Sequence, residues 1–323
     1  MTSPVSSSAN GPAALLGLAA YAAFSTHDVI VKHLGATYSP FQILFLSALL
    51  SFPLITVVLI RDEKPGTLRP VHPWWLALRC LCGATSAVCA FYAFTRLPLS
   101  QAYAIIFAAP LIITVLAIPM LGETVRLRRG FAVLLGLVGV VIVLRPGATA
   151  LDAGHVAALL AAFFGALNSI VVRKIGSDER GVVMVLYPMM ANLLLAGAII
   201  PFVYVEVPIG DLGLFAVVAL LVLVAMGFLV AAYTRGDAMI VAPMQYSQIF
   251  WAALFGAVLF DEYPDWQTYA GAAVIVLSGI YILKREATSD VSENTPVLKT
   301  RTRLGHSTGL RVGTILRRKG RNG

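Results

Sequence analysis

The segment 93-AFTRLPLSQAYAIIFAAPLIITVLAIPMLGE-123 matches 232-AYTRGDAMIVAPMQYSQIFWAALFGAVLFDE-262 without a gap. Both segments begin with Ala, an aromatic residue, Thr and Arg, both end with Glu, and they are offset by 139 residues. Near the start of each half, 29-VIVKHLG-35 resembles 170-IVVRKIG-176 at an offset of 141. The two matches keep the same order and nearly the same spacing, so the chain contains one repeated unit.

The composition around these matches is that of a membrane protein. Hydrophobic residues make up 59% of the 323 residues and charged residues only 12%, whereas a soluble domain carries about 25% charged residues. The apolar residues form runs long enough to cross about 30 Å of hydrocarbon as helices. The predicted fold is therefore an all-α polytopic membrane protein with spans at about 13–34, 40–60, 74–95, 99–120, 130–145, 154–173, 181–203, 212–233, 237–260 and 267–284.

Ten spans in two copies give five spans per copy, and an odd number forces the second copy to lie upside down relative to the first. Inverted repeats of this kind are typical of secondary transporters, whose halves exchange conformations around a central site. The expected organisation is a cytoplasmic amino terminus at 1–12, a first five-helix repeat at 13–147, a second at 154–285, and a basic, disordered cytoplasmic tail at 286–323.

The distribution of Lys and Arg predicts that both termini face the cytoplasm from the inner membrane. With that orientation, Lys32, Arg96 and Arg145 are the only basic residues on the far side, as the positive-inside rule requires. The net charge of +8 is then explained by a topology signal or by contact with anionic lipid headgroups. We expect no nucleic-acid partner. Since no Lys or Arg precedes the first span, we expect it to remain as a membrane helix and not to act as a signal peptide.

The chain resembles the EamA group of the drug/metabolite transporter superfamily. The resemblance rests on Leu121-Gly122-Glu123 and on a Gly-rich fifth span that ends at Arg145-Pro146-Gly147. The second copy departs from this pattern, because Asp261 replaces the glycine and Gln248-Ile249 stands where the first copy has Ala109-Pro110. The resemblance implies transport of a small metabolite such as an amino acid, S-adenosylmethionine, riboflavin or a drug, in either direction.

The first span carries two adjacent ionisable residues, His27 and Asp28. Ionisable groups inside a bilayer are costly and commonly functional, and a histidine titrates near neutrality. We therefore expect these residues to bind a polar substrate group or to couple transport to a proton, although a structural contact between helices would also explain them. Their repeat mates, Asn168 and Ser169, are neutral, which favours a single directed site.

Other polar and aromatic residues within spans complete the candidate substrate site. The full set is His27, Asp28, Tyr92, Gln101, Tyr103, Asn168, Tyr187, Asn192, Gln245, Gln248 and Trp251. Packing hydrogen bonds and interfacial aromatic belts are the competing explanations for these residues. A second set near span ends, in gating or interfacial roles, is Arg96, Glu123, Arg235 and Glu262.

The substrate is the least determined part of this interpretation. The polar and aromatic inventory suits a planar, amide-rich molecule, so riboflavin uptake is the sharpest expectation, with export of amino acids or drugs and S-adenosylmethionine transport as alternatives. An integral-membrane transferase is less favoured, because its acidic or His clusters are represented only by Asp261, Glu262 and Asp265. We expect no cofactor and no metal site, treat the three cysteines as packing residues, and expect a monomer or homodimer.

Overall fold

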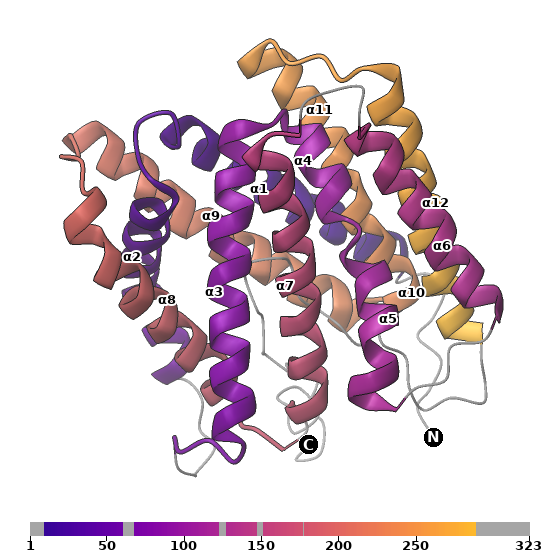
Figure 1. Ribbon diagram of the computed structural model, residues 1–323. Coiled ribbons are helices and arrows are strands. Elements are labelled where there is room, and N and C mark those ends of the chain that lie inside the picture. The colour runs from indigo at the N-terminus through magenta and orange to yellow at the C-terminus, as the bar shows by residue number, and fades with distance from the viewer. Residues whose placement is uncertain (1–9, 61–67, 123–126, 147–150, 177, 289–323) are drawn as a thin grey trace.

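The computed structural model describes residues 10–60, 68–122, 127–146, 151–176 and 178–288, and all of its regular elements are helices (Figure 1). In the first half they are α1 (Asn10–Leu34), α2 (Pro40–Ile60), α3 (Pro73–Arg96), α4 (Leu99–Ile106), α5 (Ala109–Leu121) and α6 (Leu127–Leu144). In the second half they are α7 (Ala153–Ile175), α8 (Gly181–Val203), α9 (Ile209–Arg235), α10 (Ala238–Val241), the 3-10 helix η2 (Ala242–Tyr246), α11 (Ser247–Phe260) and α12 (Trp266–Thr288).

These helices form the ten expected spans. Within the described ranges, seven helical segments are both long and apolar enough to cross a bilayer, with α4 and α5 together counted as one. The remaining three spans are α2, α6 and the interrupted segment α10–η2–α11. Helices suit the hydrocarbon region because most of their backbone groups bond within the helix itself. The sequence expectation of an all-helical membrane bundle is confirmed.

The packing of the helices follows the inverted repeat. The helix pair α3 and α7 packs closely, and so does the equivalent pair α9 and α1 from the opposite copies. Helices α6 and α12, which are mates of each other, lie side by side in Figure 1, and the mates α2 and α8 also pack together. Each copy therefore makes its main contacts with the other copy, and the two copies together form a single bundle.

The close approach of α6 and α12 depends on small residues. A Cβ atom added at Gly271 would lie 2.7 Å from the backbone oxygen of Gly139, so the two backbones touch directly. In a membrane, where lipid is as apolar as leucine, such close packing supplies the attraction between helices. This pair holds one side of the bundle together without polar contacts between the two glycines.

The fourth and ninth spans are both broken near their middle. The fourth ends as α4 at Ile106 and resumes as α5 at Ala109, with Pro110 in the first turn of α5. The ninth passes through η2, which contains Pro243. Phe107 and Tyr246 are repeat mates at these breaks, and their ring centroids are 5.4 Å apart. Because a residue meets its own mate only at the symmetry axis of a repeat, the two breaks mark the centre of the bundle.

Candidate functional site

A chain of four buried side chains crosses the centre of the bundle next to the helix breaks. The Asp28 carboxylate on α1 accepts a hydrogen bond from the imidazole of His27, with Nδ1 2.6 Å from Oδ1, and a second bond from the Tyr103 hydroxyl of α4. Gln248 of α11 donates from Nε2 to that hydroxyl at 3.2 Å. All four residues are at most 3% exposed. The sequence-predicted residues His27, Asp28, Tyr103 and Gln248 thus form one connected network, called here the Asp28 cluster.

The Asp28 cluster joins the two copies of the repeat. His27, Asp28 and Tyr103 belong to the first copy and Gln248 to the second. Aromatic rings surround the cluster, since Phe94 lies 5.4 Å and Phe107 5.7 Å from the Tyr103 ring. Motion that separates α11 from α4 would change the bond between Gln248 and Tyr103. A buried acidic group in this position can bind a cation or take up a proton.

An ion pair lies one helical turn from Asp28 on α1. Lys32 Nζ is 2.7 Å from Glu262 Oε1, and the same ammonium donates to the backbone oxygen of Leu97 at 2.7 Å. The second oxygen of Glu262 accepts from the backbone nitrogen of Leu99 at 3.2 Å. The Lys32 side chain is only 9% exposed. This ion pair therefore ties α1, the α3–α4 turn and the end of α11 together directly beside the Asp28 cluster.

Two further links between the copies lie at the same end of the bundle, the end where α1 reaches Leu34. The Tyr38 hydroxyl donates to Asp211 at 2.5 Å, and this bond is the main reason that the pKa of Tyr38 rises to about 12. The Gln42 amide donates to the backbone oxygen of Val205 at 2.6 Å and accepts from its backbone nitrogen at 3.0 Å. Together with the pair of Lys32 and Glu262, these contacts link the two copies at the Leu34 end, and we call this set of contacts the seal.

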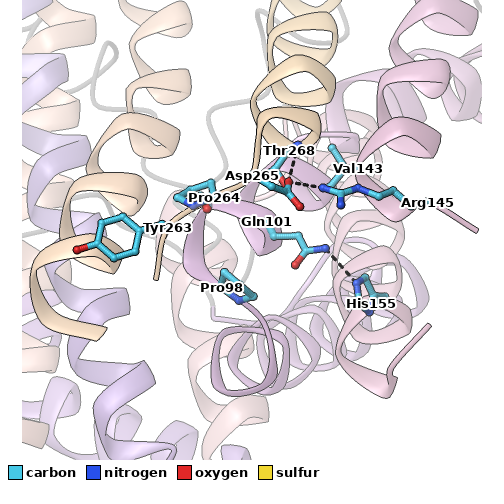
Figure 2. Close-up of a pocket in the computed structure, with 10 residues that line it drawn as sticks. Pro98, Gln101, Val143, Arg145, His155, Tyr263, Pro264, Asp265 and Thr268 are labelled. Atoms are coloured by element: carbon cyan, nitrogen blue, oxygen red, sulfur yellow. Dashed lines mark hydrogen bonds and ion pairs between the residues drawn. The ribbon is translucent and has the colours of Figure 1, made fainter. Parts of the chain in front are cut away.

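A pocket of about 240 Å³ opens at this end, between α4, α6, α7 and α12, and Figure 2 shows its lining. Arg145 points toward Asp265, whose carboxylate also accepts from the backbone nitrogen and hydroxyl of Thr268 at 3.0 and 2.7 Å. These bonds, that of Arg145 above all, lower the pKa of Asp265 to about 2. Gln101 lies within hydrogen-bond distance of His155, at 3.1 Å. The pocket thus places Gln101 apart from the Asp28 cluster.

The comparisons with known proteins agree with this geometry. The model of the EamA-like transporter family matches residues 11–145 and again residues 152–284. This chain belongs to the EamA-like transporter family. It is accordingly a secondary transporter of small metabolites and not an enzyme. The double match also supports the duplicated architecture of the fold.

Several curated transporters are similar to this EamA-family chain. The S-adenosylmethionine uptake transporter of Rickettsia conorii is 26% identical over 265 residues, covering 81% of this chain and 89% of that protein. The pseudopaline exporter of Pseudomonas aeruginosa is 27% identical over 271 residues, covering 82% and 94%. A solved crystal structure has a TM-score of 0.59 at 24% identity, over 87% of this chain and 99% of that chain, which supports the fold alone.

The other predicted site residues of this EamA transporter lie outside the Asp28 cluster. Asn168 of α7 is buried and faces Gly83 of α3, whereas the half-buried Trp251 stacks on Phe255 with centroids 6.0 Å apart. Asn192 and Gln245 are half-buried, and Tyr187 is exposed and bonds to the backbone oxygen of Leu68.

The four residues predicted for gating or interfacial roles also lie in different parts of the chain's structure or outside its described residues. Glu262 is part of the seal, and Arg96 is exposed and lies 5.4 Å from the ring of Tyr92. Arg235 is exposed at the end of α9, and Glu123 lies outside the described residues. Sequence reasoning missed Lys32, because it was counted only as a topological charge. Its position four residues after Asp28, on the same face of α1, is the signal that could have found it.

Proposed function

We propose that this EamA transporter moves an amine-bearing, positively charged or zwitterionic metabolite across the inner membrane by alternating access, with Asp28 as the group that receives its positive charge. The observation that carries this proposal is the buried Asp28 carboxylate bonded to Tyr103 at the junction of the two copies. A buried carboxylate attracts a cation strongly because the surroundings screen it poorly. The bond between Gln248 and Tyr103 then links occupancy of the site to the relative position of the copies.

Alternating access also needs one end of the bundle to close while the other opens. The seal made by Lys32, Glu262, Tyr38 and Asp211 supports an arrangement in which the Leu34 end is closed. The Lys and Arg distribution supports placing this end outside the cell and both termini in the cytoplasm. In this orientation the structure corresponds to a transporter closed to the outside.

S-adenosylmethionine is the first compound to test. It carries a sulfonium, an ammonium and a carboxylate, and the R. conorii relative is named as its uptake transporter. Riboflavin, the substrate favoured by the sequence, finds no support in the names of the relatives reported above, and as a neutral molecule it offers no cation to Asp28. A proton exchanged at Asp28 or His27 would supply the driving force if uptake depends on pH.

The test is counterflow uptake by the purified protein in liposomes. Labelled S-adenosylmethionine, methionine, lysine and riboflavin are compared for the wild type and for Asp28→Asn, Asp28→Glu and His27→Ala. We expect Asp28→Asn to abolish uptake of the positively charged compound and Asp28→Glu to retain part of it. Glu206→Gln, which removes an exposed loop carboxylate, is the matched control.

Each outcome bears on a different part of the proposal. If Asp28→Asn takes up the positively charged compound as fast as the wild type, the role of Asp28 is overturned. Uptake of riboflavin in preference to every charged compound would overturn the substrate class. An unchanged pH profile in both Asp28→Asn and His27→Ala would remove these residues from proton coupling.

A further inference from the structure

Arg79 is a fully buried charge that the Asp28 cluster does not use. It lies on α3 six residues after Pro73, about 9 Å along the helix from that end, and is 0% exposed. All three of its guanidinium nitrogens have no hydrogen-bond partner among the described residues. The residues directly before and after it on the buried face of α3, Leu76 and Cys80, belong to an apolar cluster with Val171 of α7 and Met184 of α8. An arginine inside a bilayer without an acceptor is strongly unfavourable.

The repeat shows that this charge is not needed for packing. At the offset of 139 residues, the mate of Arg79 is Val218 on α9. Val218 is also 0% exposed and belongs to the main apolar core. An apolar residue therefore fills this place in one copy of the same fold. The guanidinium in the other copy calls for an explanation other than stability, since replacing a buried charge by an apolar residue is often neutral or stabilising.

A second polar group without a partner in the described ranges lies beside the residue one helical turn from Arg79. Gly83 is four residues further along α3, and a Cβ atom added there would meet only Asn168 within 4 Å, at 3.8 Å from Oδ1. This is ordinary van der Waals contact, less tight than the contact of Gly139 and Gly271 described above. Asn168 is 2% exposed, and its Oδ1 has no hydrogen-bond partner in the described part of the chain. Donors of Arg79 and an acceptor next to Gly83, both unpartnered among the described residues, therefore lie about one helical turn apart along α3.

We propose that Arg79 and Asn168 form a second substrate subsite, in which Arg79 binds the carboxylate of an amino-acid headgroup and Asn168 accepts from its ammonium. Arg79 supplies a planar fork that matches a carboxylate, and a ligand with both an acceptor and a donor satisfies both side chains. This inference rests on the proposed function and narrows its substrate to zwitterions that carry a free carboxylate.

The two sites lie at different depths. His27 lies beside Phe91, with ring centroids 6.0 Å apart, and Phe91 is twelve residues from Arg79, about 18 Å along α3. One headgroup cannot contact Asp28 and Arg79 at once. The substrate therefore meets Asp28 nearer the Leu34 end and Arg79 nearer the Pro73 end, at successive positions of one path.

The experiment measures thermal protection of the purified full-length protein by matched pairs of compounds. The pairs are methionine with methioninamide, and S-adenosylmethionine with its decarboxylated form, and acetate is added as a bare carboxylate. We expect at least one carboxylate compound to raise the Tm of the wild type. Its partner without a carboxylate should bind more weakly, with an apparent Kd higher by roughly tenfold or more. In Arg79→Met the two compounds of a pair should give the same protection. Val218 in the other copy indicates that Arg79→Met folds.

Further variants separate this subsite from its alternatives. Gly83→Ala should keep the protection and Gly83→Leu should remove it, because the alanine Cβ only reaches van der Waals contact with Asn168 whereas the longer leucine side chain would crowd it. Arg79→Lys should bind the carboxylate more weakly than the wild type, and it replaces Arg79→Met if that variant does not fold. Asp28→Asn should keep the carboxylate protection even where transport is lost, so failure of the proposed function and failure of the subsite are distinguishable.

Three results would overturn the inference. The first is that no carboxylate protects the wild type, and the second is that Arg79→Met and the wild type are protected equally. The third comes from repeating the measurement in nanodiscs of phosphatidylcholine and of phosphatidylglycerol. If protection that depends on Arg79 follows phosphatidylglycerol and not the carboxylates, the anion is a lipid phosphate and the substrate subsite is refuted.

Discussion

At the scale of single residues, Tyr103 connects the two halves of the molecule. Its hydroxyl donates to Asp28 and accepts from Gln248. A hydrogen bond to a charged group contributes about 1.5–3 kcal/mol. We expect Tyr103→Phe to raise the KM for a positively charged substrate by roughly 10- to 100-fold in liposome uptake. Tyr281→Phe, on the exposed face of α12, should leave KM unchanged, and equal values for both variants would exclude this role of Tyr103.

Asp265 provides a pH prediction with a definite sign. Because Arg145 lowers its pKa to about 2, the carboxylate contributes stability above its ordinary pKa of about 3.9 and loses that contribution only as the pH falls toward 2. Between pH 5 and 8 it stays ionised. Asp265→Asn should therefore leave the shape of the transport pH profile unchanged across this range. A displaced profile in this variant would show that the Arg145–Asp265 pair takes part in proton coupling.

At the scale of helices, the ends of α5 and α11 show how the copies solve the same problem with different residues. Gly122 and its repeat mate Asp261 both adopt the left-handed conformation, with φ of 69° and 53°. Glycine adopts this conformation without strain, whereas aspartate does so at some cost. We expect Asp261→Gly to raise the free energy of unfolding by about 1 kcal/mol, because glycine relieves the strain of the left-handed conformation.

A matched control separates backbone strain from charge at this position. Asp261→Asn removes the same charge and keeps a side chain, so it should give a smaller gain than Asp261→Gly in thermal denaturation. Equal gains in the two variants would assign the effect to charge and not to the backbone.

The contact of α6 with α12 is the second test at this scale. A Cβ atom at Gly271 would lie 2.7 Å from the Gly139 oxygen and 2.6 Å from the Val143 side chain. Gly271→Ala should therefore destabilise the protein by about 1–3 kcal/mol, measured as a lower Tm. At Gly227 an added Cβ meets nothing within 4 Å, so Gly227→Ala should have no such effect. A Tm for Gly271→Ala equal to that of Gly227→Ala would mean that α6 and α12 move apart at little cost in free energy.

At the scale of the whole molecule, the seal at the Leu34 end predicts how the transporter opens. Glu262→Gln weakens the contact with Lys32 and should favour the state open at the Leu34 end. In a background without Cys80, Cys82 and Cys89, Ser100→Cys near the seal should then react several-fold faster with a membrane-impermeant thiol reagent. Exchanging the charges, with Lys32→Glu and Glu262→Lys together, should restore slow labelling. Equal rates in all three proteins would refute the seal.

The sequence predicted the spans well because each is a long apolar run, and the self-match predicted the two copies, whereas the packing of α3 on α7 and of α9 on α1 came from the structure. It also predicted His27, Asp28, Tyr103 and Gln248, because polar groups in such runs are rare. It did not predict which of these side chains meet, since that depends on the breaks beside Phe107 and Tyr246. Arg79 and Lys32 were missed for another reason. A basic residue near a span end serves topology in most cases, and only its partners show whether it does more.

The ring contact between Phe107 and Tyr246 has a consequence for the origin of the chain. Before the duplication, these two positions were one position, so a separate five-helix ancestor would have paired with an antiparallel copy of itself and placed the same residue against its twin. Every change at that position then altered both sides at once. Fusion into a single chain removed this restriction, and the two copies became free to evolve separately, as the present Phe and Tyr at this shared position record.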